Sequence, residues 1–587
     1  MNPSTALAVT LADELIRCGM REVVLAPGSR SAPLAIEFHR RAQAGDLRLS
    51  VRIDERSAAF CALGLAKAGR RPVAVLCTSG TAAAHFHAAV IEADESAVPL
   101  LVLTADRPPE LRGTGANQTI DQLKLYGSAV RWFCELGVPE LAGTASTARE
   151  PMTWYWRSAA SRAWGLASGA AGGVPGPVHV NIPLREPLVP DRGDPGDESG
   201  TAVAGAARPD GRPGGAPWTR FQAVAELPRA ERGLIVCGDG DYDPAPLLGL
   251  AREAGWPVLA EPSSDARRGT LALSAYHYLL ADHDFAASHR PDVIVSAGRP
   301  GLSRGQLALL RGAADAADGL VRHVVLAQGP GRWADPARSA TDVAAAISLG
   351  GGVGAAIAGG DEWLVAWLGA DRAARDAIDA ILDADPRLSE PRLARDLAAA
   401  LPDGSLLWAA SSLPVRDLDQ QLRPRSGLRI LASRGASGID GLVSSAIGAA
   451  LAHQDAGGGP AAALLGDLAL LHDAPGLMLG PDEPRPDLCL IVANNDGGGI
   501  FSGLEQAAYR GPFERVFGTP HGAKLDALAA AAGLPYYRLE TAADLAALVP
   551  AAVRPGAGLS VAELRTDRPG QTALRRELAS AASTAIR

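Results

Sequence analysis

Cysteine is scarce in this sequence and is not arranged to form cross-links or a metal cage. Among 587 residues there are six cysteines, with no two close together in the chain. Most lie in apolar stretches, where a free cysteine behaves as a small buried hydrophobe. Disulfide frameworks and Cys/His metal sites need short, regular spacings. The pattern therefore predicts reduced core cysteines in a cytoplasmic protein. They are Cys18, Cys61, Cys77, Cys134, Cys237 and Cys489.

Long apolar runs and a surplus of basic charge are also missing. No stretch approaches the roughly 18 uninterrupted apolar residues of a transmembrane helix. The N-terminal segment lacks a basic lead and carries Asp13 and Glu14 inside its apolar pattern, unlike a secretory signal. The net charge of −9 at pH 7 argues against nucleic acid, which requires a basic face. We therefore expect no nucleic-acid partner and no stable membrane insertion.

Several signatures of catalysis are absent as well. The chain has no nucleophile triad, no P-loop and no Cys/His metal spacing. The segment 233–241, GLIVCGDGD, follows an apolar run but lacks the full G-x-G-x-x-G pattern of a dinucleotide-binding turn. Chemistry has to be sought in other polar residues that follow apolar strands.

What the chain does contain is a repeated alternation of short apolar strands, glycine turns and helical stretches. Its length exceeds what one hydrophobic core usually supports. Strands that alternate with helices are typical of mainly parallel α/β sheets. A stretch rich in Pro, Gly, Asp and Ser has the composition of a linker. We predict three α/β domains, each a mainly parallel sheet flanked by helices, over 1–188, 219–375 and 376–587, with a linker over 189–218.

Two distant segments share one rhythm. Each runs from a proline through a strand, a glycine turn and a helix to a second strand that ends in a polar turn. The interval from Pro72 to Leu100 and the interval from Pro460 to Leu488 are both 28 residues. The first and last domains are therefore predicted to share an architecture.

Polar residues follow both apolar strands of the second segment. Asp467 and Asn495 stand beside glycines, and the backbone carbonyl of Gly497 adds a third oxygen. Oxygen ligands suit Mg²⁺, and parallel sheets gather ligands at the carboxyl ends of their strands. Alternatively, Asp467 and Asn495 merely cap helices, as their residue types commonly do. The spacing alone leaves both interpretations open.

A glutamate and five arginines stand at comparable positions. Glu55 begins a helix after an apolar strand, where the helix dipole ordinarily favours an acid. Alternatively, it is a semi-buried acid whose raised pKa lets it share a proton with a heterocycle nitrogen. Each arginine is most simply a solvated charge, but several on one cleft would bind carboxylates through bidentate forks. The arginines are Arg30, Arg107, Arg304, Arg416 and Arg434.

Longer motifs carry a resemblance to a known family. GDL (466–468), the later NNDG (494–497) and an isolated glutamate after an early strand resemble thiamine-diphosphate enzymes. Within these, the chain is similar to the 2-succinyl-5-enolpyruvyl-6-hydroxy-3-cyclohexene-1-carboxylate (SEPHCHC) synthase, or MenD, family of menaquinone biosynthesis. The usual third residue of the cofactor motif, glycine, is Leu468 here, which suits this family. The longer motifs are APGSRSAPL (26–34), TSGTAAA (78–84), TADRPPELRGTGANQTIDQ (104–122), SRGASGIDG (433–441) and NNDGGGIFS (494–502).

The resemblance implies an architecture and a reaction. Residues 1–188 would bind the pyrimidine of thiamine diphosphate, 219–375 would hold no cofactor, and 376–587 would bind its diphosphate with Mg²⁺ or Mn²⁺. A homodimer or homotetramer is implied, with Glu55 and Asp467 of one site in different chains. The family's activity is that of a transferase that decarboxylates 2-oxoglutarate and adds the succinyl-semialdehyde carbanion to isochorismate. The products are SEPHCHC and CO₂.

The same resemblance implies roles for individual residues by motif match. Glu55 would be catalytic, through a hydrogen bond to the aminopyrimidine ring nitrogen. The metal would be held by Asp467, Asn495 and the Gly497 carbonyl. The cofactor would contact Glu55, Ser79, Gly80, Ile439, Gly466, Asp467 and Asn495. The substrates would contact Ser29, Arg30, Arg107, Gln118, Ser412, Arg416 and Arg434, and also Arg304 from the central domain, where the motifs match poorly.

Two other functions fit parts of the pattern. One is a different thiamine-diphosphate carboligase or decarboxylase of the acetolactate-synthase kind. A pyruvate enzyme has fewer carboxylates to hold and would not need Arg107, Arg416 and Arg434 together. The other is a noncatalytic α/β binding protein, in which replacing Glu55 with glutamine would change no activity.

Overall fold

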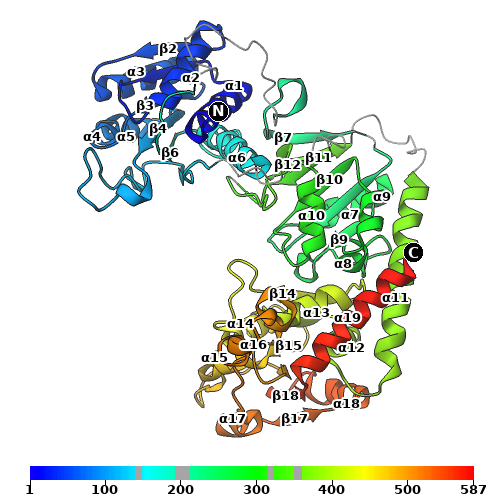
Figure 1. Ribbon diagram of the computed structural model, residues 1–587. Helices are drawn as coiled ribbons and strands as arrows, with labels where there is room; N and C mark the ends of the chain where they lie inside the picture. The colour runs from blue at the N-terminus through cyan, green and yellow to red at the C-terminus, as the bar shows by residue number, and fades with distance from the viewer. Residues whose placement is uncertain (141–148, 192–210, 229, 315–320, 330, 350–359) are drawn as a thin grey trace. The chain divides into compact units, whose positions relative to one another are not determined.

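The computed structural model describes residues 1–140, 149–191, 211–228, 230–314, 321–329, 331–349 and 360–587. Part of the predicted linker, 192–210, lies outside these described residues. Contacts divide the chain into two compact units. The first is Met1–Leu227 with Ala314–Ser348, and the second is Pro228–Ala313 with Leu349–Arg587. Figure 1 shows the course of the chain from the N-terminus to the C-terminus.

The first sheet lies wholly in the first unit and has the strand order β2-β1-β3-β4-β6-β5, with parallel pairing throughout. Its strands are β1 (Glu22–Leu25), β2 (Arg48–Val51), β3 (Val73–Cys77), β4 (Leu100–Asp106), β5 (Trp132–Glu135) and β6 (Pro177–Pro183). Its helices are α1 (Pro3–Cys18), α2 (Ala32–Gln43), α3 (Glu55–Gly69), α4 (Thr81–Ala84), α5 (His87–Glu95) and α6 (Arg149–Ala167).

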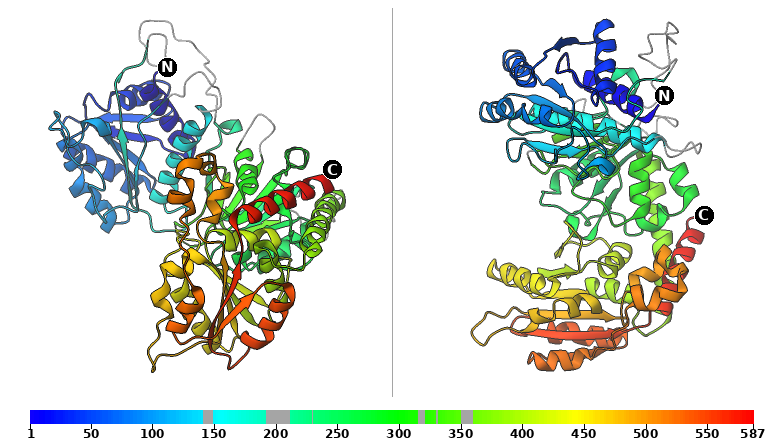
Figure 2. Two further views of the ribbon diagram at one scale, coloured as in Figure 1. Left: turned by 60° about the horizontal axis from the view of Figure 1, so that its bottom comes forward. Right: turned by 60° about the vertical axis from the view of Figure 1, so that its left-hand side comes forward.

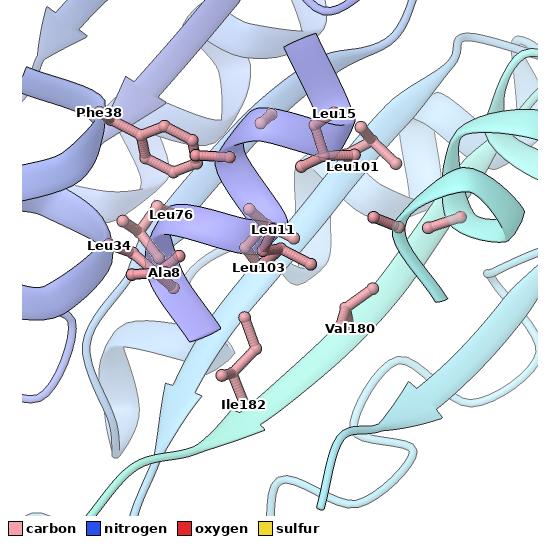
Figure 3. Packing of buried hydrophobic residues seen from close by; sticks show 14 of the residues in the cluster. Ala8, Leu11, Leu15, Leu34, Phe38, Leu76, Leu101, Leu103, Val180 and Ile182 are labelled. Atoms are coloured by element: carbon pink, nitrogen blue, oxygen red, sulfur yellow. The ribbon is translucent and has the colours of Figure 1, made fainter. Parts of the chain in front are cut away.

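Helices cover both faces of this sheet because alternate strand residues point to opposite sides. In β1, Val23 and Leu25 belong to a core with α1, α2 and α6, whereas Val24 belongs to a second core with α3 and α5. Figure 3 shows the first core, where Leu11 of α1 and Phe38 of α2 pack over the strands. Each fully buried side chain of this size contributes about 1.5–3 kcal/mol. These two cores fix the strand ends that carry the predicted site residues.

The second sheet has the order β7-β12-β11-β10-β8-β9. Strands β7 (Arg220–Leu227), β11 (Arg322–Leu326) and β12 (Asp342–Leu349) fall in or at the edge of the first unit. Strands β8 (Gly233–Cys237), β9 (Val258–Ala260) and β10 (Val293–Ala297) fall in the second unit. The helices of this region are α7 (Ala245–Ala254), α8 (Tyr276–Leu279), α9 (His283–Ser288) and α10 (Arg304–Gly312).

The third sheet lies in the second unit, with the order β14-β13-β15-β16-β18-β17 and parallel pairing. Its strands are β13 (Ser405–Ala409), β14 (Leu428–Ala432), β15 (Ala461–Gly466), β16 (Leu488–Asn494), β17 (Tyr536–Leu539) and β18 (Leu559–Arg565). The accompanying helices are α11 (Gly360–Ala384), α12 (Glu390–Ala400), α13 (Leu413–Gln421), α14 (Leu442–Asp455), α15 (Asp467–His472), α16 (Arg510–Phe513), α17 (Leu525–Ala531), α18 (Ala542–Ala552) and α19 (Arg568–Ala585).

Helices again cover both faces of the third sheet (Figure 2). In β16, Cys489 and Ile491 belong to the core formed with α12, α13 and α18. Leu490 and Val492 belong to the core formed with α14, α15 and α17. The long helices α11 and α19 lie side by side in this unit (Figure 1). Because α11 runs continuously past residue 375, the boundary predicted there falls inside a helix.

The first and third sheets have the same topology. Adding twelve to each strand number of the first sheet's order gives the order of the third. The strands of the two equally spaced segments, β3 with β4 and β15 with β16, are parallel neighbours in both sheets. The predicted α/β class with three mainly parallel sheets is confirmed, and so is the expectation that the first and third share an architecture.

Candidate functional site

A cavity opens at the carboxyl ends of β13, β15 and β16 in the second unit. Its empty volume is about 730 Å³. The strand ends are level because Gly466 of β15 pairs with Ala493 of β16. Residues that directly follow the two strands therefore reach the same edge of the sheet. The cavity brings together six of the residues predicted for this half of the site: Ser412, Ile439, Gly466, Asp467, Asn495 and Gly497.

Asp467 is the buried acid of this cavity, with 2% of its surface exposed. Its Oδ1 accepts a hydrogen bond from the Leu468 amide at 2.7 Å, and its Oδ2 accepts one from the Gly497 amide at 2.8 Å. Burial raises the pKa of Asp467, against the opposing effect of these two amides. A nearby cation would favour the ionised carboxylate in such a place.

Asn495 presents an oxygen with no partner. Its Nδ2 donates to Glu390 Oε1 at 2.9 Å, while its buried Oδ1 accepts no hydrogen bond from any described residue. Leaving a buried polar atom unpaired costs roughly 1–3 kcal/mol. Buried polar atoms of this kind commonly bind an ordered water or an ion.

The turn after β16, which contains Asp496 and Gly497, contacts a second loop at residues 518–522. A side chain at Gly497, where φ is +133°, would place its Cβ 1.9 Å from the Gly518 carbonyl oxygen, so only glycine fits. Asp496 Oδ1 accepts the amides of His521 and Gly522 at 3.0 and 2.8 Å. His521 Nε2 lies 3.3 Å from Asp467 Oδ2. The second loop therefore brings an imidazole to the Asp467 carboxylate.

These residues fit a divalent cation. Asp467 offers a carboxylate, Asn495 an unpaired carbonyl oxygen, and the Gly497 carbonyl retains one lone pair after accepting the Gly499 amide at 2.9 Å. Across the described residues, no group of three or more His, Cys, Asp or Glu side chains is placed to hold a metal. A metal here must therefore depend on the amide and backbone oxygens.

Two of the predicted arginines of the second unit lie near each other, outside the cavity wall. Arg416 Nη1 donates to the Ser412 carbonyl at 2.6 Å. Burial lowers the pKa of Arg416, and the like charge of Arg434 lowers it further. Nη1 of Arg434 is buried without a partner among the described residues. Arg304 is the exposed first residue of α10, and no described contact brings it to this pair.

Glu261 holds the loop that leads to Arg304. It is fully buried, and its Oε1 accepts the amides of Gly301 and Leu302 at 2.6 and 2.8 Å. Burial, with a contribution from Asp419, raises its pKa to about 8, while the two amides and Arg434 oppose the shift. Through these two amides the acid acts as a loop anchor.

In the first unit, the turn after β3 is joined to a distant loop. The Ser79 hydroxyl donates to the Gln118 carbonyl, and Gln118 Nε2 donates back to the Ser79 carbonyl, both at 3.0 Å. The Gly80 amide donates to Gln122 Oε1 at 2.9 Å. A Cβ at Gly80, where φ is +85°, would lie 2.9 Å from Gln118 Cγ. Three predicted site residues, Ser79, Gly80 and Gln118, are therefore adjacent.

The two arginines of the first unit are also close. Arg30 is buried, and its Nη1 donates to the Leu184 carbonyl at 2.9 Å. Burial lowers the pKa of Arg30, and the like charge of Arg107 lowers it further. The Nε atoms of both are buried and have no partner among the described residues. Ser29, beside Arg30, is exposed. Arg107 is half-buried, and Arg30 Nη2 lies 3.6 Å from Glu186 Oε1, so the two unpaired Nε donors are what remains for an anionic ligand.

Glu55 is the first residue of α3, where Asp54 caps the helix by accepting the Ser57 amide at 2.8 Å. Asp54 therefore fills the capping role, and the Glu55 side chain is not needed for it. Glu55 is only partly exposed, and its charge contributes to the raised pKa of the buried Cys77 thiol at the end of β3. Glu55 thus lies near the turn that carries Ser79 and Gly80.

Reasoning from the sequence missed four residues of these clusters. They are Gln122, Glu261, Glu390 and His521, each of which bonds to or lies within 3.3 Å of a site segment. Gln122 is the last residue of the motif at 104–122, so the sequence could have identified it as a site residue. The others reach their partners only through tertiary contacts between distant segments.

No helix among the described residues is both long enough and apolar enough to cross a membrane.

Comparisons with known proteins identify two family domains in the chain. Residues 5–125 match the family described as thiamine pyrophosphate enzyme, N-terminal TPP binding domain, and residues 415–563 match its C-terminal TPP binding domain. Thiamine pyrophosphate is another name for thiamine diphosphate. The first match covers Glu55, Ser79, Gly80 and Gln118, and the second covers Asp467, Asn495 and Gly497.

Three relatives that align over nearly their whole length carry the same name. A SEPHCHC synthase from Thermobifida fusca (strain YX) is 56% identical over 608 aligned residues, covering 100% of both chains. One from Saccharopolyspora erythraea is 46% identical over 97% of this chain and 96% of its own. One from Kineococcus radiotolerans is 44% identical over 97% of each. The chain therefore belongs to the 2-succinyl-5-enolpyruvyl-6-hydroxy-3-cyclohexene-1-carboxylate synthase family of thiamine pyrophosphate enzymes.

Proposed function

We propose that this protein is a thiamine-diphosphate-dependent transferase of menaquinone biosynthesis. It decarboxylates 2-oxoglutarate and adds the resulting succinyl-semialdehyde carbanion to isochorismate, giving SEPHCHC and CO₂. The observation that carries the proposal is the cavity in which Asp467 and the unpaired Asn495 oxygen meet Ser412 and Ile439. The name shared by the full-length relatives supports the choice of substrates. The free cysteines suit the cytoplasm, where we place the reaction.

Thiamine diphosphate, when bound, would supply the stabilisation of a carbanion on the former carbonyl carbon of the 2-oxo acid after CO₂ has left. Asp467, Asn495 and the Gly497 carbonyl would hold a divalent cation, Mg²⁺ or Mn²⁺, for the diphosphate of the cofactor. Gly466 leaves room for the diphosphate at the end of β15. Ile439, in the cavity wall, gives apolar support to the cofactor. These residues would thereby hold the diphosphate end of the cofactor in the cavity.

Glu55 would hold a proton toward the aminopyrimidine ring nitrogen of the cofactor. Ser79 and Gly80, at the neighbouring turn, would contact the same ring. General acid–base catalysis by a positioned carboxyl group contributes typically about 10²- to 10⁴-fold. Because the Asp54 carboxylate caps α3, Glu55 is left free for this task.

The arginine pairs hold the substrates. Both substrates are dicarboxylates, so four carboxylates must be bound across the two half-reactions. Arg30 with Arg107, and Arg416 with Arg434, each place two guanidinium groups together, where like charges are tolerated if an anion lies between them. Ser29, Gln118, Ser412 and Arg304 complete the proposed substrate contacts. Orientation of both substrates by these groups supplies much of the rate.

We further propose that the active protein is a homodimer or homotetramer. Each site then takes Glu55 from one chain and Asp467 from another. The domain spans 1–188, 219–375 and 376–587 serve as pyrimidine-binding, central and diphosphate-binding domains, with 189–218 as a linker. The equal topology of the first and third sheets supports this division of one cofactor between two related domains.

A product assay tests the reaction. The enzyme, thiamine diphosphate and Mg²⁺ are incubated with 2-oxoglutarate, with and without isochorismate, and products are identified by mass spectrometry. We expect a succinyl-transfer product with the mass of SEPHCHC only when isochorismate is present. Pyruvate replaces 2-oxoglutarate in the control, and efficient turnover of pyruvate would instead favour an acetolactate-synthase-like enzyme.

A further inference from the structure

The orientation of the Asn495 side-chain amide is set by Glu390, a residue outside the sequence motifs. Its Nδ2 donates to Glu390 Oε1 at 2.9 Å, and its Oδ1 is the buried oxygen without a described partner. A carboxylate only accepts hydrogen bonds, so the nitrogen must face Glu390. Rotating the amide by half a turn would set two oxygens against each other. The interaction therefore leaves the oxygen of Asn495 free for another ligand.

Glu390 is itself held firmly, with 3% of its surface exposed. It is the first residue of α12, where the Ser389 hydroxyl oxygen accepts the Arg392 amide, and its own amide donates to Gln571 Oε1 at 2.9 Å. Its Oε1 also accepts the Thr566 hydroxyl at 2.8 Å. Both the backbone and the carboxylate are fixed, so this side chain is not free to coordinate a metal.

Arg575 connects this cluster to the C-terminal helix α19. Its Nη2 donates to Glu390 Oε2 and to Asp417 Oδ2, both at 2.6 Å, and its Nε donates to Asp417 Oδ1 at 3.0 Å. Glu390 and Asp417 both line the cavity that contains Asp467. Arg575 has donors only, so an oxygen of residue 390 must face it.

We propose that Glu390 is a positioning residue that orients the Asn495 carbonyl oxygen toward the divalent cation, with Arg575 fixing Glu390. This inference rests on the metal site of the proposed function and assigns a residue beyond its ligands. Partners that orient metal ligands typically change metal affinity by about 10- to 100-fold when they are replaced. A purely structural ion pair would change stability and leave metal affinity per folded molecule unaltered.

The substitution Glu390→Gln should reverse the polarity of the contact. Arg575 requires an oxygen, so the carbonyl of the introduced glutamine faces Arg575 and its NH₂ group faces Asn495. The Asn495 amide then turns its oxygen to the glutamine and its NH₂ group toward the metal. Arg575 still pairs with Asp417, which preserves the packing of α19.

Manganese binding is the readout. In the presence of saturating thiamine diphosphate, Mn²⁺ is titrated into the protein, and free Mn²⁺ is followed by its electron paramagnetic resonance signal. We expect Glu390→Gln to weaken Mn²⁺ binding by about 10- to 100-fold. Asp396→Asn is the matched control, because it removes a carboxylate of the same helix that pairs with Arg392 and Arg395 outside the cavity. It should bind Mn²⁺ as the wild type does.

A second substitution separates orientation from a general loss of charge. Asn495→Asp should strengthen Mn²⁺ binding in the Glu390→Gln background, because one new oxygen accepts from the glutamine and the other faces the metal. In the wild-type background it sets a carboxylate against Glu390 and should give no such gain. The Asn495→Asp single variant can be compared with the wild type even if Glu390→Gln does not fold. Tighter Mn²⁺ binding by Asn495→Asp than by the wild type would overturn the inference.

The outcomes distinguish this inference from the proposed function. If the wild type takes up no Mn²⁺ with thiamine diphosphate, the proposed metal site fails. If the wild type binds Mn²⁺ and folded Glu390→Gln binds it equally well, the positioning role of Glu390 fails and the metal site stands. Equal effects of Asn495→Asp in both backgrounds would likewise contradict the orientation mechanism.

Discussion

Glutamine in place of Glu55 is expected to lower turnover by about 10²- to 10⁴-fold while thiamine diphosphate still binds. Glutamine has nearly the same size and keeps a hydrogen-bonding group at the position proposed to face the ring nitrogen, but its amide cannot give or take the proton. The fold is preserved because Asp54, and not Glu55, caps α3. The measurement is the turnover number for SEPHCHC formation, with cofactor affinity determined separately by calorimetry.

Glu92→Gln is a suitable control for this variant. Glu92 is an exposed glutamate of α5 that accepts the Ser96 hydroxyl and pairs with Lys67 at 3.9 Å, and no proposed role depends on it. Its turnover should match the wild type. Glu55→Gln turnover close to the wild-type value would favour the noncatalytic α/β binding protein or another proton-transfer residue.

Alanine in place of Asp467 is expected to weaken magnesium-dependent binding of thiamine diphosphate by about 100-fold or more, because a direct ligand matters at least as much as its supporting residues. The change removes a carboxylate and also leaves the amides of Leu468 and Gly497 without their acceptor. The turn that presents the Gly497 carbonyl therefore loosens as well. Calorimetric titration with the cofactor at a fixed Mg²⁺ concentration measures the effect.

The nearby Asp473 provides the comparison for Asp467. It follows α15, accepts the Ser444 amide at 2.7 Å, and lies outside the cavity lining. Asp473→Asn should therefore bind thiamine diphosphate and Mg²⁺ with the wild-type affinity. If Asp467→Ala bound the cofactor as tightly as the wild type, Asp467 would be a helix-start residue only, which is the alternative that the spacing left open.

The local half of this structure could be predicted from the sequence. Strands β15 and β16 are apolar runs that end beside glycine, and parallel pairing brings their carboxyl ends together. Asp467 and Asn495 were therefore expected to lie at the same edge of the sheet. The spacing shared with β3 and β4 likewise anticipated two sheets of one topology. Hydrophobic periodicity and turn residues are local properties of the chain, and they can be identified from the sequence alone.

The remainder depends on contacts between distant segments. Nothing local indicates that Glu390, 105 positions before Asn495, turns its amide, or that His521 reaches Asp467. Arg416 follows β13 and Arg434 follows β14. The two lie near each other because these strands are neighbours in the sheet, and the sequence does not show which strands pair. The roles of these residues in binding substrate stay predictions.

Mixing the two inactive variants tests the central claim that one active site is built from two chains. Glu55→Gln and Asp467→Ala proteins are unfolded together, refolded as a mixture, and assayed for SEPHCHC formation. In a mixed dimer, one site would carry both substitutions and the other would carry neither. The mixture should therefore recover about a quarter of the wild-type activity, since half of the dimers are mixed and half of their sites are intact. Activity no higher than that of either variant refolded alone, with mixed dimers shown to be present, would contradict the shared site.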